Sequence, residues 1–399
     1  MKTLRSLIIA SILLTIFFSC KNHTTKSDSK DIISHVSSQM DYALQVADSL
    51  RDSINIAPRT VLGGQIKLVA GRDWTSGFFP GNLWMVYELT KNEKWKEAAI
   101  QYTLPLENEQ WDTGTHDLGF KMFGSFGKAY KHTGDSAYKA VLIQSARSLA
   151  TRYNPTVGCI RSWDFGSWKF PVIIDNMMNL ELLMWVAKHT NDTTLSNIAI
   201  SHARTTIKNH FRENNSSYHV IDYNPETGEV EHRNTHQGYA DDSAWARGQA
   251  WGLYGFTMMY RETGLSEFLE QAEKIAGFLL TQPGISEGKV PYWDFDAPNI
   301  PDEPYDASAA AVITSAFFEL FEITGNNTYK TVAEKLLSTL ESPQFLAEVG
   351  TNHGFLLMHT TGHFPKNSEV DVPMVYADYY LLESIIRKKR IEKNKAKAH

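Results

Sequence analysis

The feature that most constrains the fold of this chain is a short joint that occurs five times along it. At each joint a helical stretch ends in Thr, Gly or Asn follows within two residues, and a second helical stretch begins after a short polar turn. The joints are LTKNEKW from Leu89, HTGDSAY from His132, HTNDTTL from His189, ETGLSEF from Glu262 and ITGNNTY from Ile323. Gly or Asn just past a helix end favours left-handed termination, and an Asp, Asn or Ser after it caps the next helix. Each joint therefore predicts a helical hairpin.

The helical stretch that leads into each joint begins near an acidic residue. These starts are Asp73, Asp117, Asp175, Asp242 and Asp306, and a sixth start, Asp371, precedes a helical stretch at the C-terminus. Successive starts lie between 44 and 67 residues apart. The chain therefore contains six similar units of about sixty residues, the mark of a repeat architecture.

The two helices of a unit differ in composition. Helices that lead into the joints are rich in Gly, Ala, Met and aromatic residues, whereas those that follow, such as SAYKAVLIQSARSLATRY from Ser136, are amphipathic. A helix that is apolar all round is buried, and an amphipathic helix covers a core with one face. The contrast predicts an inner and an outer layer. Six hairpins with a period longer than that of open tetratricopeptide solenoids predict an all-α (α/α)6 toroid over residues 31–390, with the inner helix N-termini around a single pocket.

Both ends of the chain are expected to lie outside this domain. Lys2 and Arg5 precede the apolar run LIIASILLTIFF, which is followed by Ser19 and Cys20. This pattern predicts an export signal over residues 1–20, and Cys20 resembles a bacterial lipoprotein lipidation site, although Phe17 stands where Leu is usual. Residues 21–30 are expected to form a polar tether and residues 391–399 a basic tail. The interpretation predicts a periplasmic or outer-membrane lipoprotein of a Gram-negative bacterium, in contact with the membrane only through its lipid anchor.

Composition excludes several classes of function. A chain of 399 residues with 42% hydrophobic residues can bury a large core. The net charge is −6 and the basic residues are dispersed, so no nucleic-acid surface is predicted.

With Cys20 lipidated, only Cys159 remains, which leaves no intrachain disulfide. No Cys pair or HExxH motif is present, so the sequence gives no support for a zinc site. The sequence leaves the oligomeric state open.

Asp175 stands at the start of the apolar helical run DNMMNLELLMWVA. A helix cap is the simplest explanation for an Asp at this position. A carboxyl group beside an apolar helix is also poorly solvated, which raises its pKa and lets it keep a proton near neutral pH, as a general acid must. Asp117 precedes another inner helix, so Asp117 and Asp175 form the candidate acid–base pair.

The loops before the inner helices are dense in aromatic and basic side chains. Any one of the Trp residues at positions 111, 163, 168, 245 and 251 could be core packing, but together in polar loops they favour a sugar-binding groove. His116, His219 and His236 flank the same loops. With Arg247, which can bind a carboxylate bidentately, they could receive a uronate.

Five blocks of sequence together resemble the unsaturated glucuronyl hydrolases of glycoside hydrolase family 88. They are HDLGF from His116, RSWD from Arg161, DNMMNLELL from Asp175, HQGYADDSAWARGQAWGLYGF from His236 and YADYYLLES from Tyr376, and the likeness runs from about Arg72 to Ser384. The resemblance implies an (α/α)6 barrel, no metal or cofactor, and removal of a 4,5-unsaturated uronate from the non-reducing end of oligosaccharides made by polysaccharide lyases. It also implies that Asp175 protonates carbon 4 of the enol ether and activates the water that adds at carbon 5, while Asp117 binds ring hydroxyls and keeps Asp175 protonated.

The same resemblance implies a set of sugar contacts: His116, His219, Gln237, Trp245, Arg247 and Trp251, and less closely Trp74 and Trp163. Residues 352–369 carry no block that matches the family, and within them Lys366 and Ser368 are either anion contacts or plain surface residues. The polysaccharide that supplies the substrate stays open among glycosaminoglycans, ulvan-like algal polymers and bacterial polysaccharides.

Two alternatives stand beside this hypothesis. The unsaturated rhamnogalacturonyl hydrolases of family 105 share the barrel and the hydration chemistry, but they tend to carry Asn-Gly where this chain has Gln249 and Ala250. A lipid-anchored glycan-binding protein without catalysis would account for the aromatic residues, but it gives no reason for two carboxyl groups beside apolar helices.

Overall fold

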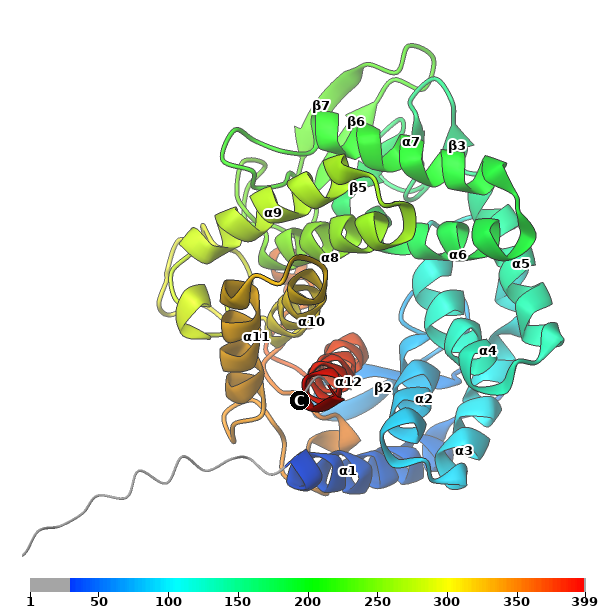
Figure 1. Ribbon diagram of the computed structural model, residues 1–399, viewed down its shortest axis with the longest axis vertical. Coiled ribbons are helices and arrows are strands. Elements are labelled where there is room, and N and C mark those ends of the chain that lie inside the picture. Colours follow the sequence, from blue (N-terminus) through cyan, green and yellow to red (C-terminus); the bar gives the residue numbers. More distant parts are fainter. Residues whose placement is uncertain (1–28, 398–399) are drawn as a thin grey trace, which may run out of the picture.

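The computed structural model describes residues 29–397, and these residues form a closed ring of two helical layers (Figure 1). The inner layer contains α2 (Phe78–Thr90), η2 with α4 (Gly119–Gly127 and Lys128–Thr133), η3 with α6 (Ile174–Asn179 and Leu180–Thr190), α8 (Ala246–Thr263), α10 (Ala307–Thr324) and α12 (Val375–Lys397). The outer layer contains α1 (Ser29–Leu50), α3 (Glu93–Thr103), α5 (Ser136–Ala150), α7 (Thr193–Asn209), α9 (Ser266–Thr281) and α11 (Asn327–Leu340). Each inner helix contacts the next, and α12 packs against α2. The predicted (α/α)6 toroid is confirmed.

All five predicted joints connect an inner helix to an outer one. The residue after each inner helix is left-handed, with φ of 56° at Lys91, 69° at Gly134, 58° at Asn191, 69° at Gly264 and 71° at Gly325. The next residue is Asn or Asp at four joints, and its side chain caps the outer helix. Leu265 takes this place at the fourth joint and makes no side-chain cap. The joints form as predicted because their signals are local.

The predicted helix starts need correction. Asp306 does cap α10, since its Oδ1 accepts hydrogen bonds from the backbone N–H groups of Ser308 and Ala309. In contrast, α2, α8 and α12 begin about four residues after Asp73, Asp242 and Asp371. The ends of the ring also differ from the expected boundaries: α1 starts at Ser29, and α12 continues to Lys397 through most of the expected basic tail. The lipidation site at Cys20 lies outside the described residues.

The structure also contains short strands, which were not predicted from the sequence. β1 (Ala57–Leu62) pairs with β2 (Gln65–Val69), and β3 (Tyr153–Asn154) pairs with β4 (Cys159–Ile160). A three-stranded antiparallel sheet contains β5 (Pro171–Ile173), β6 (Val220–Tyr223) and β7 (Val230–Asn234). Short helical turns complete the connections: η1 (Leu104–Trp111), η4 (Ile285–Glu287), η5 (Asn352–Gly354) and η6 (Phe364–Lys366). β5 leads directly into η3, so Asp175 follows a strand and lies in a 3-10 turn rather than at the cap of a long α-helix.

Glycines let the inner helices approach closely. A Cβ on Gly77 would lie 2.1 Å from the carbonyl oxygen of Lys121 in η2, and a Cβ on Gly255 would lie 2.5 Å from Cβ of Met177 in η3. η2 is itself a π-helix, a wide turn that often occurs at functional sites. Small residues therefore set the spacing between α2 and η2 and between α8 and η3.

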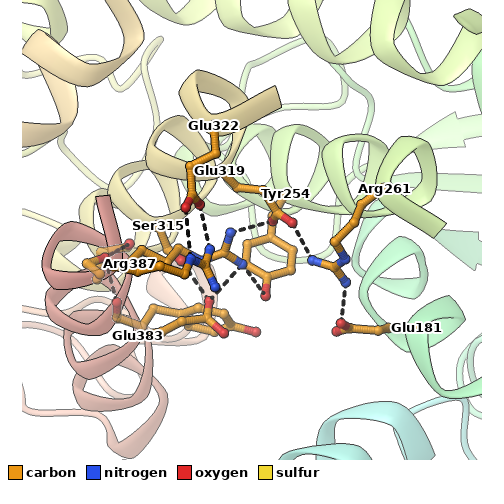
Figure 2. A network of polar contacts seen from close by, with 12 residues as sticks. Glu181, Tyr254, Arg261, Ser315, Glu319, Glu322, Glu383 and Arg387 are labelled. Atoms are coloured by element: carbon orange, nitrogen blue, oxygen red, sulfur yellow. Dashed lines mark hydrogen bonds and ion pairs between the residues drawn. The ribbon is translucent and has the colours of Figure 1, made fainter. Parts of the chain in front are cut away.

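A network of charged and polar side chains joins four inner helices (Figure 2). Arg387 of α12 pairs with Glu319 of α10 at 2.6 Å, and its Nη2 donates to the hydroxyl of Tyr254 in α8. Arg261 of α8 binds Glu319 and also Glu181 of α6. Ser315 of α10 donates to Glu383 of α12 at 2.6 Å. These contacts connect α6, α8, α10 and α12 across the interior of the ring.

Candidate active site

A pocket of about 220 Å³ lies at the end of the ring where the inner helices begin. Its lining comes from distant parts of the chain: Arg59, Trp74, His116, Asp117, Phe120, Trp163, Phe165, Ile173, Asp175, His236, Gln237, Arg247, Gly362, His363, Glu369 and Tyr376. The loops before the inner helices therefore meet at one cavity. The two candidate carboxyl residues, Asp117 and Asp175, both face it.

Asp175 is a buried carboxyl group of the pocket. It lies in η3 between β5 and α6 and is 9% exposed. Burial raises the pKa of this carboxyl to about 7, because a charge is poorly solvated there. The positive charge of Arg247 opposes this shift, and the negative charge of Asp117 adds to it. Asp175 can therefore hold and release a proton near neutral pH.

His219 presents a ring N–H to Asp175. Its Nδ1 accepts hydrogen bonds from the backbone N–H groups of His236 and Gln237, both at 3.1 Å. Burial lowers the pKa of His219 well below its usual value, so the ring is neutral. A neutral ring whose Nδ1 accepts must carry its proton on Nε2. This Nε2 lies 3.8 Å from Oδ1 of Asp175.

His116 and Asp117 form a second polar pair at the pocket. Nε2 of His116 lies 3.2 Å from Oδ1 of Asp117, and the Thr115 hydroxyl donates to Oδ2 of Asp117 at 2.8 Å. Burial lowers the pKa of His116, so this ring is neutral as well. The contacts fix the direction of the Asp117 carboxylate, which is the group suited to bind sugar hydroxyls.

Arg247 is held by groups on the far side of the pocket wall. Its Nη1 donates to Oδ2 of Asp306 at 2.5 Å and to the carbonyl oxygen of Thr361 at 2.6 Å, and its Nη2 donates to the carbonyl oxygen of Gly362 at 2.6 Å. A guanidinium has five N–H groups, so these contacts leave two for a ligand. Gln237 donates to the same Gly362 carbonyl at 3.0 Å. Arg247 and Gln237 thus line the pocket and also anchor the loop over residues 361–369.

The four tryptophans predicted as sugar contacts fall into two groups, and Trp111 and Trp168 do not line the pocket. Trp74 and Trp163 line the pocket, and the ring of Trp74 lies 5.1 Å from that of Tyr376. Trp245 and Trp251 are buried behind the lining: Trp245 packs against His219 with ring centroids 4.5 Å apart, and the indole N–H of Trp251 is buried without a hydrogen-bond partner. The second pair supports the pocket from behind.

Several predicted positions are not brought to the pocket. Asp73 and Asp306 lie behind its wall, where they bind Arg59 and Arg247. Asp242 and Asp371 are exposed, and Asp371 pairs with His359 at 2.6 Å. The expectation that all six acidic starts surround the pocket is therefore wrong, because α8 and α12 begin only after the exposed loops that carry these residues. Lys366 and Ser368 are exposed and do not line the cavity.

Sequence reasoning missed some of the lining. Arg59 of β1 binds Glu369 with two hydrogen bonds, at 2.6 and 2.9 Å, and binds Asp73 as well. Phe165, His363 and Tyr376 also lie at the pocket. Tyr376 belongs to a block used for the family resemblance and could have been singled out there. Arg59 lies upstream of that resemblance, and no local pattern marks it. Within residues 29–397, no three His, Cys, Asp or Glu side chains are placed to hold a metal ion.

Comparison with known proteins identifies the family of this chain. The sequence profile of Glycosyl Hydrolase Family 88 matches residues 50–283. The chain belongs to glycosyl hydrolase family 88. An unsaturated glucuronyl hydrolase of Formosa agariphila is 48% identical to this chain over 348 residues, 86% of each chain. An unsaturated chondroitin disaccharide hydrolase of Streptococcus pneumoniae is 31% identical over 79% of this chain and 81% of its own.

Solved structures of unsaturated glucuronyl hydrolases resemble this chain over nearly its whole length. The crystal structure of an unsaturated glucuronyl hydrolase specific for heparin matches with a TM-score of 0.88 and 46% identity, and covers 92% of this chain and 98% of its own. The unsaturated glucuronyl hydrolase of Bacillus sp. GL1 matches with a TM-score of 0.82 and 26% identity over 90% of this chain and 97% of its own. The family 88 fold therefore extends beyond the residues that the profile matches.

Proposed function

We infer that the protein is an unsaturated glucuronyl hydrolase, which removes a 4,5-unsaturated uronate from the non-reducing end of lyase-generated oligosaccharides. The observation that carries this conclusion is the environment of Asp175. This buried carboxyl has a pKa of about 7, it faces a sugar-sized pocket, and it lies beside a second carboxylate. Identity of 48% to a named unsaturated glucuronyl hydrolase over 86% of both chains supports the same activity.

The proposed reaction is hydration of an enol ether. The protonated carboxyl of Asp175 gives its proton to carbon 4, and the electron pair of the C4–C5 double bond forms the new C–H bond. Water then adds at carbon 5 and returns a proton to the Asp175 carboxylate, so the enzyme is unchanged. The product is a hemiketal, which opens to a ketone at carbon 5 and a hemiacetal at carbon 1. Collapse of this hemiacetal breaks the bond to the aglycone.

The surrounding side chains take supporting roles in this proposal. The Nε2–H of His219 points at Oδ1 of Asp175 and stabilises the carboxylate that forms when the proton leaves. Asp117 and His116 bind ring hydroxyls, and the two remaining N–H groups of Arg247 receive the uronate carboxylate. Trp74 and Trp163 provide apolar surface for the sugar ring. Trp245 and Trp251 hold His219 and the catalytic turn in place from behind.

Loss of the ultraviolet absorbance of the unsaturated uronate tests the proposal directly. Purified protein should consume this chromophore, and Asp175→Asn should reduce the rate by at least about a thousandfold, because the amide cannot act as an acid. Asp242→Asn changes an exposed aspartate of the same loop system and should leave the rate unchanged. Near-normal turnover by Asp175→Asn would rule out the assigned role.

The substrate source and the family 105 alternative need a panel of substrates. We propose unsaturated glucuronyl disaccharides as the preferred class, because two proteins that are 48% and 46% identical to this chain are unsaturated glucuronyl hydrolases. Turnover should be compared on lyase products of glycosaminoglycans, ulvan-like polymers, bacterial polysaccharides and rhamnogalacturonan. Preference for the last would favour the family 105 activity. Saturable binding with no turnover of any of them would favour a glycan-binding protein.

We also propose that residues 1–20 direct export and that Cys20 carries a lipid. The positive residues, apolar run and Ser-Cys pair at the N-terminus support this. In a Gram-negative host the wild-type protein should fractionate with membranes, and Cys20→Ala should move it to the soluble fraction. A soluble wild-type protein would contradict the anchor.

A further inference from the structure

Phe165 combines a place in the catalytic pocket with an open apolar surface. Its side chain is 53% exposed, and among the large exposed apolar side chains of residues 29–397 it alone lines this pocket. Its ring lies 4.8 Å from that of Trp163, with the two planes 17° apart. Trp163 is only 8% exposed, so it covers one face of Phe165 from inside the pocket. The exposed surface of Phe165 therefore lies at the mouth.

The loop that carries Phe165 is fixed on both sides of this residue. Asp164 accepts hydrogen bonds from both Nη atoms of Arg152, at 2.9 and 3.0 Å. Gly166 has a φ of 83°, and a Cβ there would lie 2.5 Å from the ring of Trp168. The indole of Trp168 in turn donates to Asn234 of β7. The loop that carries the exposed ring is therefore held in place before a ligand binds. Stacking of a ligand on this ring costs little conformational entropy, because the loop does not have to become ordered.

Unpartnered hydrogen-bonding groups lie near this ring. Both ring nitrogens of His363 are buried and have no hydrogen-bond partner. The His363 ring lies 4.7 Å from that of His236, which lies 5.8 Å from that of Phe165. Burial lowers the pKa of His363 to about 4, so at neutral pH its ring has one donor and one acceptor. An apolar ring next to such groups suits a pyranose, which has C–H faces and hydroxyl edges.

We propose that Phe165 determines aglycone specificity, as the platform on which the sugar next to the unsaturated uronate stacks. This inference rests on the proposed function and deepens it. The cavity of about 220 Å³ is smaller than the ~300–1,000 Å³ of pockets that enclose a drug-sized ligand, so the second ring must extend to the mouth. Asp175 lies in the closed part and Phe165 in the open part, in the order that such a substrate requires.

The test compares two substrates that share the reacting ring. One is the methyl glycoside of the unsaturated uronate, and the other is an unsaturated disaccharide with a neutral pyranose as aglycone. Phe165→Ala should lower kcat/KM on the disaccharide about five- to tenfold, the scale of one aromatic stacking contact, and change the methyl glycoside less than about twofold. Phe165→Trp should keep the disaccharide rate, and Phe165→Leu, which keeps apolar bulk without a flat ring, should lose most of it.

Trp111→Ala is the matched control, because Trp111 is 64% exposed and does not line the pocket. It should leave both substrates unaffected. Equal losses on the two substrates in Phe165→Ala and Phe165→Leu would overturn the inference, since the residue would then only support the loop. Unchanged rates on both substrates would overturn it too. If the wild-type protein hydrates neither substrate, the proposed function is wrong and so is this inference. That result differs from a change in the ratio of kcat/KM on the two substrates.

Discussion

Nε2 of His219 lies 3.8 Å from Oδ1 of Asp175, and neither atom has a hydrogen-bond partner. This separation is too long for a hydrogen bond but suits contact through a small bridging group or a slight closure on binding. Because the backbone fixes Nδ1 of His219 as an acceptor, the N–H of this ring can only point toward Asp175. The carboxyl group proposed as catalytic therefore lies next to a donor that has no partner in the protein alone.

Removal of this donor should impair the chemical step. His219→Phe keeps a flat ring but loses Nε2–H, and we expect kcat to fall about a hundredfold, the scale of one preorganised donor, with a smaller change in KM. The variant also leaves two backbone N–H groups unpaired, so Tm should fall as well. Steady-state kinetics, with kcat calculated from the concentration of folded protein, separate the loss of catalysis from the loss of stability. His232→Phe, at an exposed histidine of β7, should show neither, and a normal kcat in His219→Phe would contradict the role.

The pH dependence should follow the ionisation of Asp175. In the proposed reaction Asp175 acts in its protonated form, and its pKa is about 7, so kcat/KM should fall as pH rises through that value. The charge of Asp117 helps to keep the pKa high. Asp117→Asn removes this charge, so the alkaline limb of the profile should move to lower pH, in addition to any loss in rate. Asp242→Asn should leave the limb in place, and a shift to higher pH in Asp117→Asn would contradict the assignment.

The charged network should contribute to stability without contributing to catalysis. Arg387→Met keeps bulk but leaves the buried carboxylates of Glu319 and Glu383 short of a partner, which typically costs about 3–5 kcal/mol. Arg390→Met breaks the pair with Glu322 at a side chain that is 51% exposed, where about 0–1 kcal/mol is expected. Thermal unfolding should show a clear fall in Tm only for the first variant. A fall in kcat at a temperature where Arg387→Met is folded would show coupling between the network and the site.

The spacing between α8 and η3 should set the position of Asp175. Gly255→Ala places a methyl group 2.5 Å from Cβ of Met177, two residues after Asp175, so it should displace the catalytic turn and lower kcat. Gly277→Ala in outer helix α9 meets no atom within 4 Å and should instead stabilise the protein by about 0.5–1 kcal/mol. Gly255→Ala should therefore lower kcat, whereas Gly277→Ala should raise Tm and leave kcat unchanged. A wild-type kcat in Gly255→Ala would show that the turn tolerates the shift.

The sequence was sufficient for the ring because the ring is built from local signals. Gly134 ends one helix and Asp135 caps the next without help from the rest of the chain. The alternation of apolar and amphipathic helices then assigns the two layers. The buried carboxyl at position 175 could be singled out for the same reason, since the apolar run that desolvates it is adjacent in sequence.

The parts that escaped prediction depend on distant pairing. β5 forms because Val172 pairs with Ile221, and no pattern in either segment indicates this pairing. Arg59 is held at the pocket by a hydrogen bond to Glu369, which lies 310 residues further along the chain. Residues 352–369 form an irregular loop in which several non-glycine residues, among them His353 and Asn367, have positive φ. No periodic pattern predicts such a segment.

Closure of the ring by α12 against α2 has a consequence for biosynthesis. The catalytic cavity takes Arg59 and Trp74 from the portion of the polypeptide that leaves the ribosome early, and Tyr376 from the portion that leaves almost last. A nascent chain that has been translated as far as α10 already contains Asp117 and Asp175, yet its cavity lacks one wall. Enzymatic competence therefore begins only once translation has passed the final helix, and a chain terminated before α12 should carry both acids and remain inert.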